Sequence, residues 1–261
     1  SAIAMMFMGL TIANIGGVPL ATWVGQHIGW RSAFAGIAVL GVITMLSLFK
    51  ALPQGSVGQK PDVMQELKVL TRPAVMLALL TTVMGAGILF TLYTYIAPTL
   101  STITHASPTF VTCMLVLVGL GFSIGNHYGG KFSDQSIDRT LIGFLVVLIV
   151  LMGLFPILAK TSIGAAISLI IFGAATFALV PPLQMRVMSV AHEAPGLASS
   201  VNIGAFNLGN ALGAALGGAV ISLNMGYAAV PVSGAVLAAL TLVLVFVQKR
   251  LYQHDHPATC E

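Results

Sequence analysis

The stretch GLTIANIGGVPLATWVGQHIGWR, residues 9–31, is apolar and long enough to cross a lipid bilayer. It also holds residues that an exposed soluble helix avoids, namely Gly9, Gly16, Gly17, Pro19 and Gly25. In such a helix glycine costs about 1 kcal/mol and proline about 3 kcal/mol relative to alanine. Within a membrane, small residues instead let a second helix backbone approach closely. The stretch therefore predicts a membrane helix that bends and packs tightly.

The composition of the whole chain indicates that its solvent is lipid. Of 261 residues, 57% are hydrophobic and only 7% are charged, with a mean hydropathy of +0.98. A soluble domain has roughly 25% charged residues, so this chain cannot cover itself with a polar surface. The lysines and arginines are scattered between apolar runs, with only Lys249 and Arg250 adjacent, and form no basic patch, which argues against a nucleic-acid partner. The two cysteines have no metal-ligand spacing, and we expect neither a metal nor a cofactor.

Eight apolar runs have the roughly 20 residues that a transmembrane helix needs. They cover residues 2–24, 31–51, 73–97, 108–129, 140–159, 162–184, 196–222 and 227–247. Only one connection, residues 52–72, is long. Its apolar residues Val63, Leu67 and Leu70 would share one face of a helix. That pattern leaves two interpretations open, an amphipathic helix on the membrane surface or a solvated linker.

The basic residues predict the orientation of the chain. If residue 1 is cytoplasmic and the runs alternate, only Arg31 and Lys160 fall on the opposite side. The cytoplasmic segments then hold the other nine basic residues: Lys50, Lys60, Lys68, Arg72, Lys131, Arg139, Arg186, Lys249 and Arg250. This distribution follows the positive-inside rule and predicts that both termini are cytoplasmic.

An internal repeat relates the two ends of the chain. With an offset of 193 residues, Asn14 aligns with Asn207 and Gly16 with Gly209. Further matches are Ala21 with Ala214, Gly25 with Gly218 and Gly41 with Gly234. An even number of runs separates the copies, so both would have the same topology, as in the parallel repeats of secondary transporters.

The repeat predicts a domain organisation. The six runs in 73–247 form one complete bundle, and 1–51 would supply the last two helices of an earlier bundle. Residues 52–72 would be a cytoplasmic linker and 248–261 a cytoplasmic tail. By the same offset, about 120 residues should precede Ser1. We therefore expect helices 5–12 of a twelve-helix all-α membrane protein.

A loop motif follows the fourth run. The sequence GGKFSDQSIDRTL, residues 129–141, places glycines where two helix ends approach each other. Asp134 is positioned to accept hydrogen bonds from a neighbouring helix N-terminus, where the helix dipole favours negative charge. Arg139 can pair with an acid or with a lipid phosphate. A tight turn with ordinary membrane-surface charges is the alternative.

These motifs resemble those of the major facilitator superfamily. Gly130 to Asp134, followed by Arg139, is similar to the loop that joins the second and third helices of each half of these transporters. Residues 9–25 resemble the glycine–proline motif of the fifth helix in drug–proton antiporters, although Gly16-Gly17-Val18-Pro19 replaces the usual Gly-Pro pair. Residues 195–218 resemble the eleventh helix of bacterial sugar-efflux and drug-efflux members. The resemblance covers the whole chain and is specific for the family, with drug–proton antiporters and arabinose efflux permeases as the most similar types, but it does not identify the substrate.

Polar and aromatic residues in the runs are candidates for a translocation path. Buried unsatisfied amides are costly in hydrocarbon, so Asn14, Asn202, Asn207 and Asn210 should face a polar cavity or another helix. The resemblance places Phe90, Tyr93 and Tyr95 near a central cavity, whereas tyrosines at that height also form interfacial belts. Both interpretations stay open for each group.

The resemblance implies a secondary transporter that exports a sugar or drug by proton antiport through alternating access. The expected partners are a small-molecule substrate, protons and the lipid bilayer, with a full-length monomer in the bacterial inner membrane. The lipid-depth parts of the runs contain no acidic or basic residue, so the sequence offers no proton site. One rival is a non-transporting fragment or assembly partner. A membrane-embedded enzyme, which would need clustered acidic, histidine or cysteine residues, is disfavoured.

Overall fold

The computed structural model describes residues 13–17, 20–21, 24–25, 28–51 and 68–255. The chain divides into two compact units, Ser1–Val63 and Met64–Glu261. All regular structure in the described residues is helical, and seven helical segments there are long and apolar enough to span a membrane. The all-α membrane fold predicted from the sequence is confirmed.

The first unit contains the helices η1 (Ala13–Gly17) and α3 (Trp30–Ala51). η1 is a single π-helical turn. α3 starts directly after Gly29, whose φ of +107° suits glycine, and it matches the predicted run 31–51. Most of the first predicted run, including Gly9 and Pro19, lies outside the described residues, as does most of the 52–72 linker.

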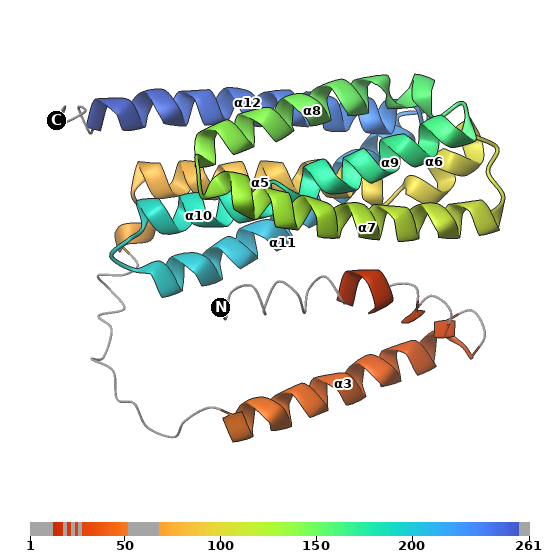
Figure 1. Ribbon diagram of the computed structural model, residues 1–261, viewed down its shortest axis with the longest axis horizontal. Coiled ribbons are helices and arrows are strands. Elements are labelled where there is room, and N and C mark those ends of the chain that lie inside the picture. Colours follow the sequence, from red (N-terminus) through yellow and green to blue (C-terminus); the bar gives the residue numbers. More distant parts are fainter. Residues whose placement is uncertain (1–12, 18–19, 22–23, 26–27, 52–67, 256–261) are drawn as a thin grey trace. The chain divides into compact units, whose positions relative to one another are not determined.

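The second unit contains eight helical segments in its described part (Figure 1). They are α5 (Pro73–Tyr93), α6 (Ile96–Ile103), α7 (Pro108–Ser133), α8 (Ile137–Leu158), α9 (Ser162–Phe177), α10 (Val180–Val190), α11 (Pro195–Ser222) and α12 (Ala229–Asp255). α9 and α10 together make one membrane-length segment. The third predicted run extends beyond residue 97 and divides into α5 and α6, which corrects the prediction of one helix over 73–97.

Prolines explain both interruptions. Pro98 lies in the first turn of α6, and it can neither donate a hydrogen bond to the carbonyl of Thr94 nor avoid a clash with it. The chain consequently leaves the helix at Thr94 and Tyr95. Pro181 and Pro182 lie in the first turn of α10, after the helix has ended at Phe177. The run predicted over 162–184 is therefore divided into α9 and α10.

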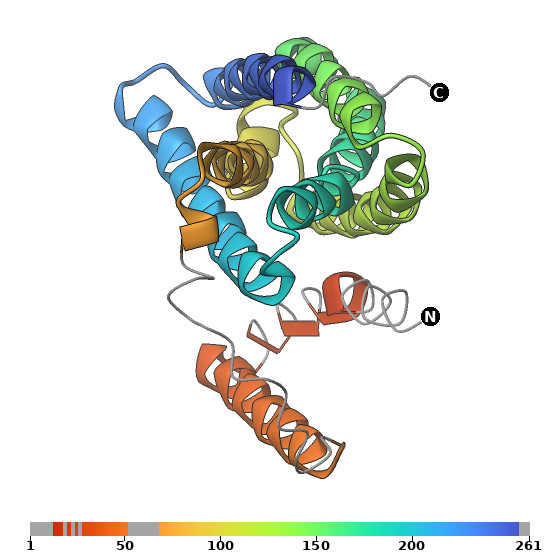
Figure 2. The ribbon, with the colours of Figure 1, turned by 90° about the vertical axis from the view of Figure 1, so that its left-hand side faces the viewer.

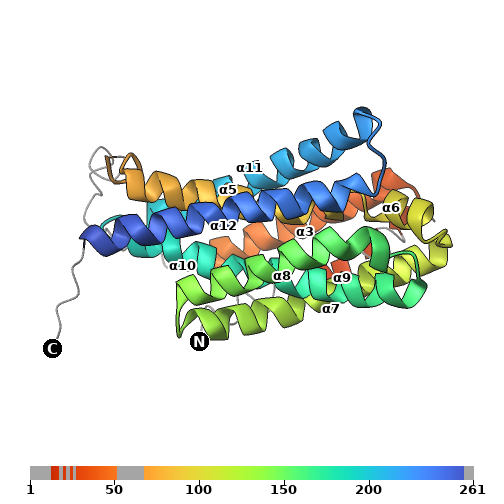
Figure 3. The ribbon, with the colours of Figure 1, turned by 90° about the horizontal axis from the view of Figure 1, so that it is seen from above.

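The helices of the second unit pack in pairs. α5 lies along α11, α7 along α9, and α8 along α12, as the end-on view in Figure 2 and the view in Figure 3 show. α5 also contacts α12 and α10, which joins the pairs into one bundle. Large fully buried side chains, among them Leu145, Leu148, Phe155 and Phe172, fill the space between them.

The outward surface of the bundle is apolar. On α8, Val146, Val150, Leu154 and Ile157 recur every three or four residues, and each is more than 40% exposed. An exposed apolar stripe of this length is unfavourable in water but suits a helix that faces acyl chains.

One end of the second unit collects most of its basic residues. The N-terminal ends of α5, α8 and α11 and the C-terminal ends of α7, α10 and α12 meet there (Figure 1). This basic end carries Lys68, Arg72, Lys131, Arg139, Arg186, Lys249 and Arg250, whereas Lys160 lies in the α8–α9 turn at the other end. α7, α8 and α12 extend here beyond the predicted runs, because hydropathy detects the apolar part of a helix and not its polar terminal turns.

Candidate functional site

Glycines bring α5 and α11 into backbone contact. Gly209, Gly213 and Gly217 are spaced four residues apart on α11 and therefore lie on one face. A methyl group at Gly213 would meet the backbone of Gly87, with its Cα atom 2.8 Å away. A methyl group at Gly217 would lie 2.7 Å from the carbonyl oxygen of Thr91. The two helices run in parallel at a separation that only glycine permits.

Tyr95 fixes the α5–α6 break against α11. Its hydroxyl donates a 3.0 Å hydrogen bond to the carbonyl oxygen of Ala214. A methyl group at Gly217 would lie 2.6 Å from the ring, and one at Gly218 would lie 2.8 Å from the hydroxyl. The sequence allows two interpretations of Tyr95, as part of a translocation path or of an interfacial belt. In the structure its ring packs on the glycines of a neighbouring helix.

We expect Tyr95→Phe to lower the free energy of unfolding by about 1 kcal/mol, the net value of one hydrogen bond. The phenylalanine ring would still pack on α11, so the lost stability would come from the hydroxyl group alone. Thermal unfolding of the detergent-solubilised protein measures it. Tyr128→Phe is the matched control, because Tyr128 on α7 is 48% exposed. Equal effects of the two substitutions would contradict the assigned role of Tyr95.

An aromatic chain links the two helix breaks. The rings of Phe90 and Tyr93 pack edge to face at 5.8 Å, and Tyr93 lies 5.6 Å from Phe122 of α7. Phe122 stacks on Phe177 at 4.0 Å. Tyr93 is the last residue of α5 and Phe177 the last of α9, so Phe122 touches the residue that precedes each break.

Asparagines on α11 fall into two groups. Asn202 is fully buried and donates a 2.6 Å hydrogen bond to Gln184 of α10, which in turn donates to Ser199 at 2.8 Å. Asn202 therefore joins two helices. Asn207 is exposed and donates to the carbonyl oxygen of Ile203 in its own helix, and Asn210 is half-buried. These two remain candidates for a polar path, and the side chain of Asn14 lies outside the described residues.

The loop motif is shorter than the sequence indicates. α7 continues to Ser133 and α8 begins at Ile137, so only residues 134–136 are non-helical. Asp134 ends α7 with an exposed side chain, and its predicted hydrogen bond to a neighbouring helix stays a prediction. Ser136 caps α8 by accepting a hydrogen bond from the backbone N–H of Arg139. Gly130 faces open space, whereas Gly129 packs on Ala178, the residue that follows α9, where a methyl group would lie 2.6 Å from its Cα atom.

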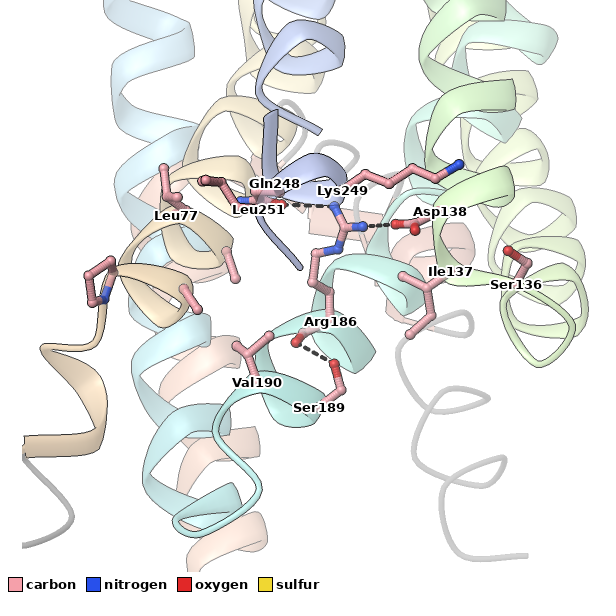
Figure 4. Close-up of a pocket in the computed structure, with 13 residues that line it drawn as sticks. Leu77, Ser136, Ile137, Asp138, Arg186, Ser189, Val190, Gln248, Lys249 and Leu251 are labelled. Carbon is pink, nitrogen blue, oxygen red and sulfur yellow. Dashed lines mark hydrogen bonds and ion pairs between the residues drawn. The ribbon is translucent and has the colours of Figure 1, made fainter. Parts of the chain in front are cut away.

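A buried polar network joins four helices near the basic end (Figure 4). Arg186 of α10 forms an ion pair with Asp138 of α8 and donates a 2.8 Å hydrogen bond to Gln248 of α12. Gln248 donates a 2.7 Å hydrogen bond to the hydroxyl of Thr81 on α5. The Arg186 side chain is 11% exposed, and Gln248 and Thr81 are buried. The desolvated arginine is thereby paired and hydrogen-bonded, which such a charge requires.

A cavity of about 550 Å³ adjoins this network. Its walls come from α5, α8, α10 and α12, and they include the apolar Leu77 and Val190 as well as the charged Arg186 and Lys249 (Figure 4). In the part of the chain that the structure describes, no three histidine, cysteine or acidic side chains gather in a way that could hold a metal ion.

A second ion pair lies at the surface of the basic end. Arg72, at the start of α5, donates hydrogen bonds of 3.1 and 2.7 Å to the two carboxylate oxygens of Glu193, between α10 and α11. The Arg72 hydrogen bond is the main reason that the pKa of the Glu193 carboxyl is lowered from its usual 4.5. The pair is exposed, so solvent screens it and it contributes little to stability.

Sequence comparison decides the family. The model of the Major Facilitator Superfamily matches residues 1–202. The chain belongs to this superfamily. The inner membrane transport protein YdhP of Escherichia coli K12 is 66% identical over 250 residues, which cover 96% of this chain and 64% of YdhP. The MFS-type transporter YfhI of Bacillus subtilis is 35% identical over 244 residues, covering 94% of this chain and 62% of YfhI.

AraJ of Escherichia coli K12 is 32% identical over 263 residues, covering 98% of this chain and 66% of AraJ. The chain thus spans about two thirds of the length of the curated relatives it matches. Membership in the superfamily confirms the resemblance drawn from the loop motif and the glycine-rich helices.

Sequence reasoning misses the most connected polar residues of this family member. In the sequence, Asp138 is only a neighbour of Arg139, and Arg186 is only one basic residue among those on the cytoplasmic side. Gln248 falls in the predicted tail, because the last apolar run ends at residue 247. One feature of the sequence could have indicated the network. Arg186 lies only four to five residues after two prolines in an otherwise apolar segment, which implies that its charge pairs with a buried side chain.

In the first unit, a methyl group added at Gly16, Gly17 or Gly25 would have no described atom within 4 Å. Their expected repeat mates behave differently, since Gly209 and Gly218 pack on α5 and Tyr95. The role of the glycine–proline stretch in packing one helix against another therefore stays a prediction.

Proposed function

We propose that this protein is a secondary transporter that exports a small molecule of the sugar or drug class by alternating access. Residues 73–247 would form one of its two bundles, 52–72 the cytoplasmic linker, and 1–51 the end of the other bundle. Family membership and the similarity to a protein named as an inner membrane transport protein support this function. They also support a location in the inner membrane, with the basic end in the cytoplasm by the positive-inside rule.

The observation that carries the proposal is the aromatic chain between the two broken helices. Discontinuous helices commonly form the substrate sites of transporters. Here Phe90 and Tyr93 lead to one break, and Phe122 connects them to Phe177 at the other. Flat aromatic rings with one hydroxyl suit a substrate with an apolar face and a few polar groups. A change at either break would be transmitted to the other through Phe122.

The coupling ion is proposed from the antiporter type that the sequence resembles. Within the described helices, no acidic side chain contacts the rings of the aromatic chain. We therefore propose a proton site that lies away from these rings. Asn207 and Asn210 would add hydrogen-bonding groups to the path.

Transport by proteoliposomes tests the proposal. The protein, expressed from its complete gene, is reconstituted, and flux of a labelled pentose or a cationic dye is measured under an imposed pH gradient. We expect flux that a protonophore abolishes. Phe122→Ala should reduce it at least tenfold, because the ring touches both breaks, whereas Phe246→Ala, on an exposed position of α12, should not. Absence of gradient-driven flux for every compound of both classes would favour a non-transporting protein.

A further inference from the structure

A groove of about 360 Å³ lies between the end of α7 and the start of α8, at the basic end. Phe132 and Phe144 form apolar walls, with their rings 6.3 Å apart. Gln135, Ser136, Arg139 and Thr140 give it a polar mouth, and Gly143 and Val147 continue it along α8. The groove is thus amphipathic along its length, with its polar part at the loop and its apolar part toward the middle of the span.

Arg139 places a positive charge at the mouth of this groove, and no carboxylate of the described residues balances that charge. The neighbouring acid, Asp138, is committed to Arg186 in the interior of the bundle. No other carboxylate in the described residues lies within ion-pair distance of Arg139, whose side chain is exposed. A cation in the first turn of a helix is also disfavoured by the helix dipole, so an anion at this position would be favourable.

Gly143 makes room for a chain-like ligand. It lies one helical turn beyond Arg139 on the same face of α8. Open space extends beyond its Cα atom, since a methyl group there would have no atom within 4 Å. Phe144 and Val147 flank this gap, and Phe132 and Val147 are each more than 40% exposed.

We propose that this groove binds an anionic phospholipid, with the phosphate on Arg139 and an acyl chain lying over Gly143 between Phe144 and Val147. A phospholipid is the ligand that combines one negative charge with an adjoining apolar chain at the height where a helix leaves the hydrocarbon. A basic side chain near the membrane surface contributes about 1 kcal/mol to attraction of an anionic lipid, which corresponds to about fivefold in retention.

Native mass spectrometry of the full protein, purified in detergent with equal amounts of phosphatidylglycerol and phosphatidylcholine, tests this site. We expect the wild-type protein to retain phosphatidylglycerol preferentially. Arg139→Gln should lower that retention about fivefold, and Gly143→Leu should lower retention of both lipids by filling the groove.

Two controls match these variants. Lys160→Gln removes a basic residue at the other end of the bundle, and Gly153→Leu adds the same side chain to α8 at another glycine with open space. Neither should change retention. Arg139 is exposed, so its variant should fold as the wild type does, which thermal unfolding checks. Equal retention by Arg139→Gln and the wild type, or an equal loss in Lys160→Gln, would overturn the proposal.

Discussion

Replacing Gly125 with alanine is expected to lower the free energy of unfolding of the bundle by about 3 kcal/mol. A methyl group at this position of α7 would collide with the backbone of Ala174 on α9, with the carbonyl carbon 2.7 Å and the Cα atom 2.8 Å away. A flexible side chain could rotate aside, but the helix backbone cannot, so the two helices must separate. The glycine contacts at Gly121 and Gly129, one turn to either side, would be loosened by the same movement.

The matched control is Gly153→Ala on α8, where the added methyl group meets no atom within 4 Å. Alanine is intrinsically the better helix former by about 1 kcal/mol, so this variant should be as stable as the wild type or slightly more stable. Thermal unfolding of both detergent-solubilised variants makes the comparison. Similar stabilities of the two would show that α7 and α9 do not depend on glycine for their approach.

Substitution of Arg186 with methionine is expected to cost about 3 kcal/mol, since one partner of a largely buried ion pair is removed. Asp138 would lose its cation, and the buried oxygen of Gln248 would lose its donor. Four helices meet in this network, so the substitution should weaken the packing of all four helices and not only one contact.

A double-mutant cycle isolates the pair. Asp138→Asn and Arg186→Met should be less than additive when combined, with a coupling of about 1–2 kcal/mol. Arg72→Gln, which breaks the exposed pair with Glu193, serves as the control and should change the unfolding temperature little. Strict additivity of the Asp138 and Arg186 substitutions would contradict the ion pair as the connecting contact.

Much of the architecture could be predicted from the sequence because hydrocarbon imposes a simple rule. Every backbone polar group in the bilayer needs an internal partner, so long apolar runs become helices. The predicted runs match α3, α7, α8 and α11 to within a few residues, whereas α12 continues well beyond residue 247, to Asp255. The family followed from short motifs, in which Gly130, Asp134 and Arg139 stand at recognisable spacings.

The contacts of the candidate site could not be predicted in the same way, because they join residues far apart in the chain. Tyr95 contacts α11 at the point where Pro98 interrupts the helix, at Thr94 and Tyr95, and Gly217 leaves space for its ring. Arg186 finds Asp138 and Gln248, 48 residues before it and 62 after it, through the pairing of α8 with α12. The predicted run for α8 also began too late to include Asp138, and the run for α12 ended too early to include Gln248.

The sequence by itself therefore determined that the chain is a helical membrane protein, where its spans lie, and which superfamily it belongs to. Those properties depend on local composition, on short motifs and on the solvent. The tertiary structure alone decided which glycines are contacts and which face open space, and how the charges at the basic end are paired. Glycines such as Gly125 and Gly153 look alike in the sequence, and only the packing of neighbouring helices distinguishes them.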